Sequence, residues 1–101
     1  MEKRPLSKPE APTGEHVALC VAAVRETSAA GNRMVVWTFE LPGGQRVRHY
    51  TVVRRVETGL TAQALGLPLK PLRLSEAGGR QCRVTVAKDG DWLKVSGVRP
   101  L

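Results

Sequence analysis

Aromatic side chains are scarce in this chain of 101 residues, because Trp, Tyr and Phe together make up only 4% of it. A small domain with so few rings must build its core mainly from Val, Leu and Ala, which favours a β-sheet. Long apolar runs are absent as well, since residues 17–24 and 34–39 fall far short of the ~20 residues that cross a bilayer as a helix. No apolar segment follows Lys3 and Arg4, so the pattern predicts no secretory signal and a cytoplasmic protein.

Groups that carry chemistry are also few. Neither of the two cysteines, Cys20 and Cys82, belongs to a CxxC motif or a His-rich cluster, which excludes the zinc sites and disulfide frameworks that such spacings define. Both fall on strands predicted to be neighbours, where a disulfide is conceivable, but buried free thiols are the expected state. Among the nine acidic residues only Asp89 and Asp91 have a DxD spacing, and both fall in a predicted hairpin turn. No ExxH group and no GxSxG motif occurs. We therefore expect no enzyme, no metal and no cofactor.

Positive charge, by contrast, is plentiful. Sixteen Lys and Arg stand against nine Asp and Glu, which gives a formal net charge of +7 and a pI near 10.3. A polyanion is the first partner to consider for such a protein, because neutralising phosphates releases their counterions. Basic structural domains share this composition, so charge alone leaves the partner open.

The chain divides into two parts. Residues 1–13 hold three prolines and five charges without apolar periodicity, which predicts a flexible N-terminal arm. Residues 14–101 form one predicted domain, with strand patterns at 15–26, 34–41, 45–55, 80–88 and 92–98. A helix is predicted between the third and fourth strands, where Leu60, Ala64 and Leu67 share a face and Gly66 ends the helix. Residues 69–79 are expected to be an irregular connection.

Alternation along the strands assigns their faces. In the first strand we expect one common face for Val17, Leu19, Val21 and Ala23. Gly31 and Asn32 are expected to take the positive φ angles of the turn that follows. In the second strand Trp37 and Phe39 are assigned to the core, and the opposite side holds Met34, Val36 and Thr38.

The remaining strands alternate in the same way. The third strand is expected to place Arg46, Arg48, Tyr50 and Val52 on one face, with the inner face formed by Val47, His49, Thr51 and Val53. In the fourth strand, Cys82, Val84 and Val86 point inward. In the fifth strand, Leu93 and Val95 share a face opposite Trp92 and Lys94.

The order of three strands, a helix and two strands predicts the fold class. It is typical of an all-β, five-stranded OB-like barrel with one short helix between strands three and four. An open α+β sheet is the alternative, since element order alone does not prove closure.

Several residues occur in an order that resembles a known family. They are Gly14, Ser28, Gly31, Asn32, Met34, Phe39 and Glu40, followed by ALGL at 64–67 and GRQCRVTV at 79–86. This order is similar to that of small phage-type OB-fold proteins that bind single-stranded DNA, long catalogued as a domain of unknown function. His16 stands where that family often has an aromatic residue. The resemblance implies a phage or mobile-element origin and a single-stranded DNA ligand.

The third strand is the leading candidate site, because residues 45–55 carry four arginines and no acid. In OB barrels the exposed faces of strands two and three bind oligonucleotides, flanked by the loops between strands one and two and between four and five. Arg46 and Arg48 would pair with phosphates while Tyr50 stacks a base. The alternative is a solvated face whose arginines only resist edge aggregation.

Five further residues complete the predicted nucleic-acid interface. Arg33, Arg54, Arg55 and Lys94 are candidate phosphate contacts, and Trp92 either stacks a base or packs in the core. The sequence thus predicts a non-enzymatic protein that binds single-stranded nucleic acid, DNA before RNA, with low sequence specificity. The alternative is an OB-fold protein-interaction subunit of a larger nucleoprotein, replication or recombination complex.

Overall fold

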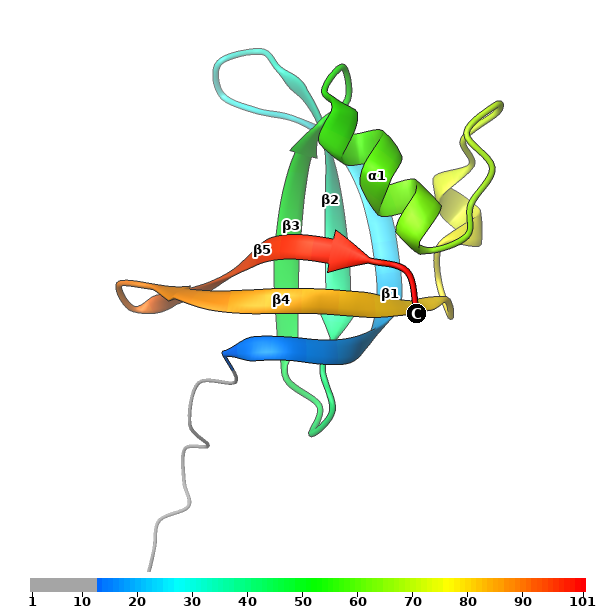
Figure 1. The fold of residues 1–101 in the computed structure, drawn as a ribbon. Coiled ribbons are helices and arrows are strands. Elements are labelled where there is room, and N and C mark those ends of the chain that lie inside the picture. The colour runs from blue at the N-terminus through cyan, green and yellow to red at the C-terminus, as the bar shows by residue number, and fades with distance from the viewer. Residues whose placement is uncertain (1–12) are drawn as a thin grey trace, which may run out of the picture.

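Five antiparallel strands account for most of the structure, a computed structural model that describes residues 13–101 (Figure 1). The strands are β1 (Gly14–Thr27), β2 (Arg33–Glu40), β3 (Arg46–Val52), β4 (Gln81–Asp89) and β5 (Trp92–Arg99). One helix, α1 (Val56–Ala64), and one short 3₁₀ turn, η1 (Leu74–Glu76), lie between β3 and β4. The protein is therefore mostly β with one short helix, as predicted. The predicted arm at residues 1–13 lies, apart from Thr13, outside the described residues.

The strands form a single sheet in the order β3-β2-β1-β4-β5. The sheet folds over on itself, so that the β4 and β5 ribbons cross those of β2 and β3 in Figure 1. The two edge strands, β3 and β5, come close to each other, but within the described residues no ladder of hydrogen bonds joins them. The sheet is open at this seam, and the structure does not show the closed barrel that the sequence predicts.

Strand β1 belongs to both halves of the folded sheet. Residues 14–19 pair with β4 and residues 19–27 pair with β2, and a bulge between Cys20 and Ala22 lies where the strand bends. Before the bulge Ala18 and Cys20 are buried, whereas after it Ala23 shares a register position with a core residue of β2. Because a bulge adds one residue, it shifts the alternation by one. The prediction of one common face is therefore wrong for Val17, Leu19, Val21 and Ala23.

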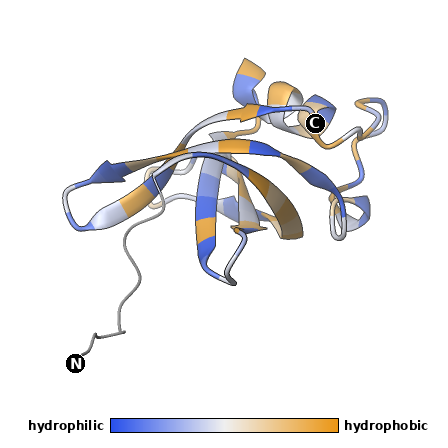
Figure 2. Ribbon diagram, turned by 60° about the horizontal axis from the view of Figure 1, so that its bottom comes forward, coloured by the Kyte–Doolittle hydropathy of each residue, from blue (hydrophilic) through white to orange (hydrophobic). Residues whose placement is uncertain are grey.

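The core lies between the two halves of the sheet and under helix α1. Trp37 and Phe39 of β2 are fully buried, as predicted from their alternation. The facing residues are small or β-branched, and the described ones include Ala18, Cys20, Val47, Cys82, Val84, Val86 and Val95. Along the strands, hydrophobic and hydrophilic bands alternate, as Figure 2 shows. Burial confirms the inward assignments of the second and fourth strands, and of Val47 and Thr51 in the third. The inward assignment of Val53 is wrong, because Val53 follows the end of β3 and is exposed.

Both cysteines are buried in this core as free thiols, Cys20 on β1 and Cys82 on β4. Burial raises the pKa of both thiols, and the neighbouring Cys20 adds to the shift at Cys82, which reaches about 12. Thiols held in this protonated state are weak nucleophiles and act as small apolar side chains.

The turn between β1 and β2 departs from the prediction at one residue. Gly31 has a φ of +87°, but no residue other than glycine takes a positive φ among residues 13–101, so the expectation for Asn32 is wrong. Instead, the backbone N–H of Asn32 donates to the hydroxyl oxygen of Ser28 at 3.1 Å. The serine thus stabilises the turn without strain at Asn32.

In the β4–β5 turn Gly90 has a φ of +63° and occupies the first central position, with Asp91 after it.

Helix α1 lies where the sequence predicts it, but it turns a different side to the core. Its buried residues are Thr58, Thr61, Ala62 and Ala64, while Leu60 is 53% exposed. The predicted inward position is therefore right for Ala64 and Leu67 and wrong for Leu60. The helix ends before Gly66, as predicted, and Gly66 has a φ of +76°. Arg80 also stabilises this end, because its Nη1 donates to the carbonyl oxygens of Leu65 and Gly66.

A chain of buried polar groups determines which side of α1 faces the sheet. The indole N–H of Trp37 donates to the hydroxyl oxygen of Thr51 at 2.9 Å. The hydroxyl of Thr58 lies 2.7 Å from that of Thr51 and 2.9 Å from the carbonyl oxygen of Val52. Because buried polar groups are costly unless they are paired, Thr58 must face inward to complete the chain. The chain joins β2, β3 and α1.

Replacing Thr51 by valine should lower the free energy of unfolding by about 1 to 3 kcal/mol, because the Trp37 N–H would stay buried without its acceptor. Urea denaturation followed by tryptophan fluorescence measures the change. The matched control is Thr38→Val on the outer face of β2, which should change stability by less than about 0.5 kcal/mol. Equal losses in the two variants would contradict the structural role of the Thr51 hydroxyl.

Candidate nucleic-acid interface

The outer face of β2 and β3 is formed by residues that alternate with the core residues. In the antiparallel register Thr38 lies opposite Arg48, Val36 opposite Tyr50, and Met34 opposite Val52. Inward burial of Trp37 and Phe39 on β2 forces their neighbours outward, and pairing with β3 carries the same orientation to the next strand. The face predicted from alternation is thus present in the structure.

Tyr50 forms the centre of this face. Its side chain is 52% exposed, and in the register it lies beside Val36 of β2, which in turn pairs with Val24 of β1. Val36 is almost fully buried although it points away from the core, whereas Val24 is about half exposed. A tyrosine ring next to aliphatic side chains offers a flat apolar surface with a hydroxyl, which suits stacking by a nucleic-acid base.

The two arginines of this face differ in their electrostatic surroundings. Arg46 Nε lies 3.2 Å from Glu40 Oε1, so its charge is balanced by a carboxylate on the neighbouring strand. Arg48 is exposed and forms no ion pair with any carboxylate of residues 13–101. A guanidinium without a carboxylate partner among the described residues, two residues from an exposed ring on the same strand face, is the stronger candidate for a phosphate contact.

Three other predicted arginines gather at the end of β3, away from Arg46. Arg33 begins β2 and Arg54 follows β3, and both line one surface pocket with Gly31 and Asn32. Arg55 is the residue before helix α1, so it belongs to the same turn as Arg54. Strand β3 ends at Val52, so the predicted strand is too long by the residues that carry these two arginines.

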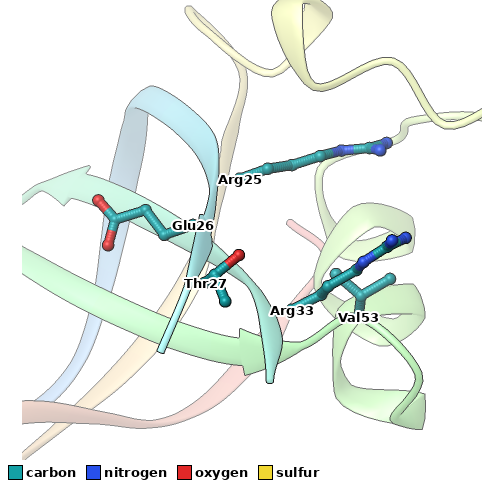
Figure 3. Close-up of a pocket in the computed structure, with 5 residues that line it drawn as sticks. All are labelled: Arg25, Glu26, Thr27, Arg33 and Val53. Atoms are coloured by element: carbon teal, nitrogen blue, oxygen red, sulfur yellow. The ribbon is translucent and has the colours of Figure 1, made fainter. Parts of the chain in front are cut away.

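Sequence reasoning missed one residue of this region. Arg25 of β1 lines a pocket with Arg33, Thr27, Glu26 and Val53. Figure 3 shows the side chains of Arg25 and Arg33 extending toward the same side, while Glu26 points to the opposite side of the β1–β2 hairpin. Arg25 reaches this side because of the bulge in β1. The sequence carried no clear signal of that shift.

Trp92 and Lys94 lie on the β4–β5 hairpin, which extends past β3 on the left of Figure 1. The Trp92 side chain is 78% exposed, so the alternative that it packs in the core is wrong. Lys94 Nζ is 4.0 Å from Asp89 Oδ2 across the hairpin. The eight predicted residues thus form three groups, namely Arg46, Arg48 and Tyr50; Arg33, Arg54 and Arg55; and Trp92 and Lys94.

The described residues show no arrangement typical of a metal site or a membrane span. Within residues 13–101 no three His, Cys, Asp or Glu side chains come together so that they could hold a metal ion. In the same part of the chain no helix has the length and apolar character to cross a membrane. His49 lies on the inner side of β3 as predicted, paired in register with Trp37.

The sequence matches no family model and no curated protein. The resemblance to the phage-type family stays a prediction.

His49 should make the stability depend on pH. Burial lowers the pKa of its imidazole, and the charge of Glu57 partly opposes this shift. The unfolded chain therefore binds a proton more readily than the folded one as pH falls through about 6.5. The free energy of unfolding should fall between pH 7.5 and 5.5, with a slope below about 1.4 kcal/mol per unit.

Urea denaturation of the wild type and of His49→Gln at several pH values in this window tests the effect. The variant should show the shallower slope, and an unchanged slope would remove His49 as its source.

Proposed function

We propose that this protein binds single-stranded nucleic acid without catalysing a reaction, with single-stranded DNA as the ligand and little sequence specificity. The observation that carries the proposal is the pair of Arg48 and Tyr50 on the outer face of β3. Arg48 is a guanidinium without a carboxylate partner in the described chain, and Tyr50 is an exposed ring beside it. Single-strand binders combine these two features, cations for the backbone and rings for the bases.

We further propose that the fold is of the OB type. The strand order, the helix between β3 and β4, and the approach of β3 to β5 support this assignment. In that fold the ligand lies across strands two and three, between the β1–β2 and β4–β5 connections. Arg33 lies at the first of these connections and Trp92 at the second.

The proposal of a phage or mobile-element origin rests on the sequence resemblance. The proposal of a cytoplasmic location rests on the free thiols.

Tyr50→Ala should weaken binding to a labelled thymine oligonucleotide by about 1 to 3 kcal/mol, which is the contribution of stacking on one ring. Fluorescence anisotropy measures the dissociation constant. Thr38→Ala on the neighbouring strand is the control, because it removes a side chain from the same face without removing a ring. Equal affinities in the two variants would exclude Tyr50 from the interface.

Arg48→Gln should reduce the slope of log affinity against log salt by about 0.7, the value for one phosphate contact with a single strand. Arg73→Gln is the control, since Arg73 pairs with Glu76 on η1 and lies outside the proposed face. An unchanged slope in Arg48→Gln would show that Arg48 contacts no phosphate. If the wild type binds no oligonucleotide even at low salt, the proposal fails and the protein-interaction alternative takes its place.

A further inference from the structure

A second surface runs along helix α1 and differs in chemistry from the outer face of β2 and β3. It is a groove of about 490 Å³ between the β3–α1 turn, the helix and the segment that follows it. This volume lies within the range of roughly 300 to 1,000 Å³ that is typical of ligand-binding clefts. Its apolar lining residues are Val53, Val56, Leu60, Leu69 and Leu72.

The apolar lining is exposed in an unusual way. Val56 is 68% exposed and Leu60 is 53% exposed, although both belong to the only α-helix of the described chain. The buried side of the same helix is made of small residues, among them Thr58 and Thr61. A short helix normally buries its large aliphatic residues and exposes its threonines. A cluster of large aliphatic side chains left in water marks an interaction surface.

Positive charge borders this groove. Arg54 and Arg55 line it, and the pocket that holds Arg25 and Arg33 adjoins it at Val53. None of the four arginines forms an ion pair with a carboxylate of residues 13–101. Glu26 lines the adjoining pocket but points away from Arg25 and Arg33 in Figure 3, and Glu57 is the acidic residue of the first helical turn. The border therefore keeps a net positive charge.

We propose that the groove along α1 binds a short acidic segment of a partner protein. A large apolar side chain of that segment lies between Val56, Leu60 and Leu69, and its carboxylates pair with the arginines of the border. This assigns a protein partner to the molecule, which goes beyond the binding of nucleic acid on the outer face of β2 and β3.

The lining of the groove favours a peptide over a nucleic acid. Bases bind by stacking on flat rings, and none of the groove residues is aromatic. Branched aliphatic walls instead fit the side chains of an amphipathic peptide. The charge also argues against a second copy of the chain, since each copy carries +7 and presents the same arginines.

Selection from a phage-displayed library of random 12-residue peptides tests the proposal, with immobilised wild-type protein as the target and Leu60→Ser for counter-selection. The expected peptides carry net negative charge and at least one Leu, Ile, Met, Phe or Trp. The best of them is then synthesised with a fluorophore, and its dissociation constant is measured by anisotropy.

Variants separate this site from the proposed nucleic-acid face. The double variant Val56→Ser, Leu60→Ser should weaken binding of the peptide by about tenfold or more and leave oligonucleotide binding unchanged. Arg54→Gln and Arg55→Gln should each weaken binding of the peptide by about two- to fivefold. Val17→Ser, another exposed valine but outside the groove, is the matched control and should have no effect on the peptide. Tyr50→Ala should weaken binding of the oligonucleotide and leave binding of the peptide unchanged.

Four outcomes would overturn the proposal. No peptide is enriched on the wild type over Leu60→Ser, or the enriched peptides lack acidic residues. Alternatively, a thymine oligonucleotide displaces the peptide and the groove variants weaken the oligonucleotide, which would make the groove part of the nucleic-acid interface. Finally, light scattering shows a dimer that Leu60→Ser dissociates, which would assign the groove to a second copy. The two peptide-selection results and the light-scattering result do not depend on whether the wild type binds DNA.

Discussion

The hydrogen bonds that Trp37 and Thr58 make to the hydroxyl of Thr51 are the constraint on which the surfaces of this protein depend. A fully buried indole needs an acceptor for its N–H, and in this core the acceptor is a threonine of the neighbouring strand. Once Trp37 and Thr51 point inward, alternation turns Val36 and Tyr50 outward. Thr58 completes the chain from the helix. One polar chain therefore orients β2, β3 and α1 together.

The same constraint explains why the molecule has two distinct surfaces. On the sheet, inward burial of large rings leaves a tyrosine and an arginine outside, which is the composition of a single-strand interface. On the helix, inward burial of small threonines leaves Val56 and Leu60 outside, which is the composition of a peptide groove. The two proposed ligands differ because different side chains stay outside the core. They are an arginine and a tyrosine on the sheet, and aliphatic residues on the helix.

The ion pairs show where the positive charge of this protein is balanced by a carboxylate and where it is not. Arg46, Arg73, Lys94 and Arg99 each have a carboxylate partner in the described chain, and such exposed pairs add little free energy but do balance charge. The arginines without such a partner include Arg48 on the sheet and Arg54 and Arg55 beside the helix. Part of the unbalanced positive charge therefore lies at the two proposed surfaces.

Sequence alone determined the element order and the faces of β2, β3 and β4, because no extra residue shifts the faces within these strands and the burial of Trp37 and Phe39 follows from hydrophobicity. It could not determine β1, where a bulge of one residue reverses the alternation and brings Arg25 beside Arg33. It also misplaced Leu60, because a buried hydrogen bond to Thr58 outweighed the aliphatic pattern of the helix. A bulge and a polar contact between distant residues depend on partners that only the tertiary structure brings together.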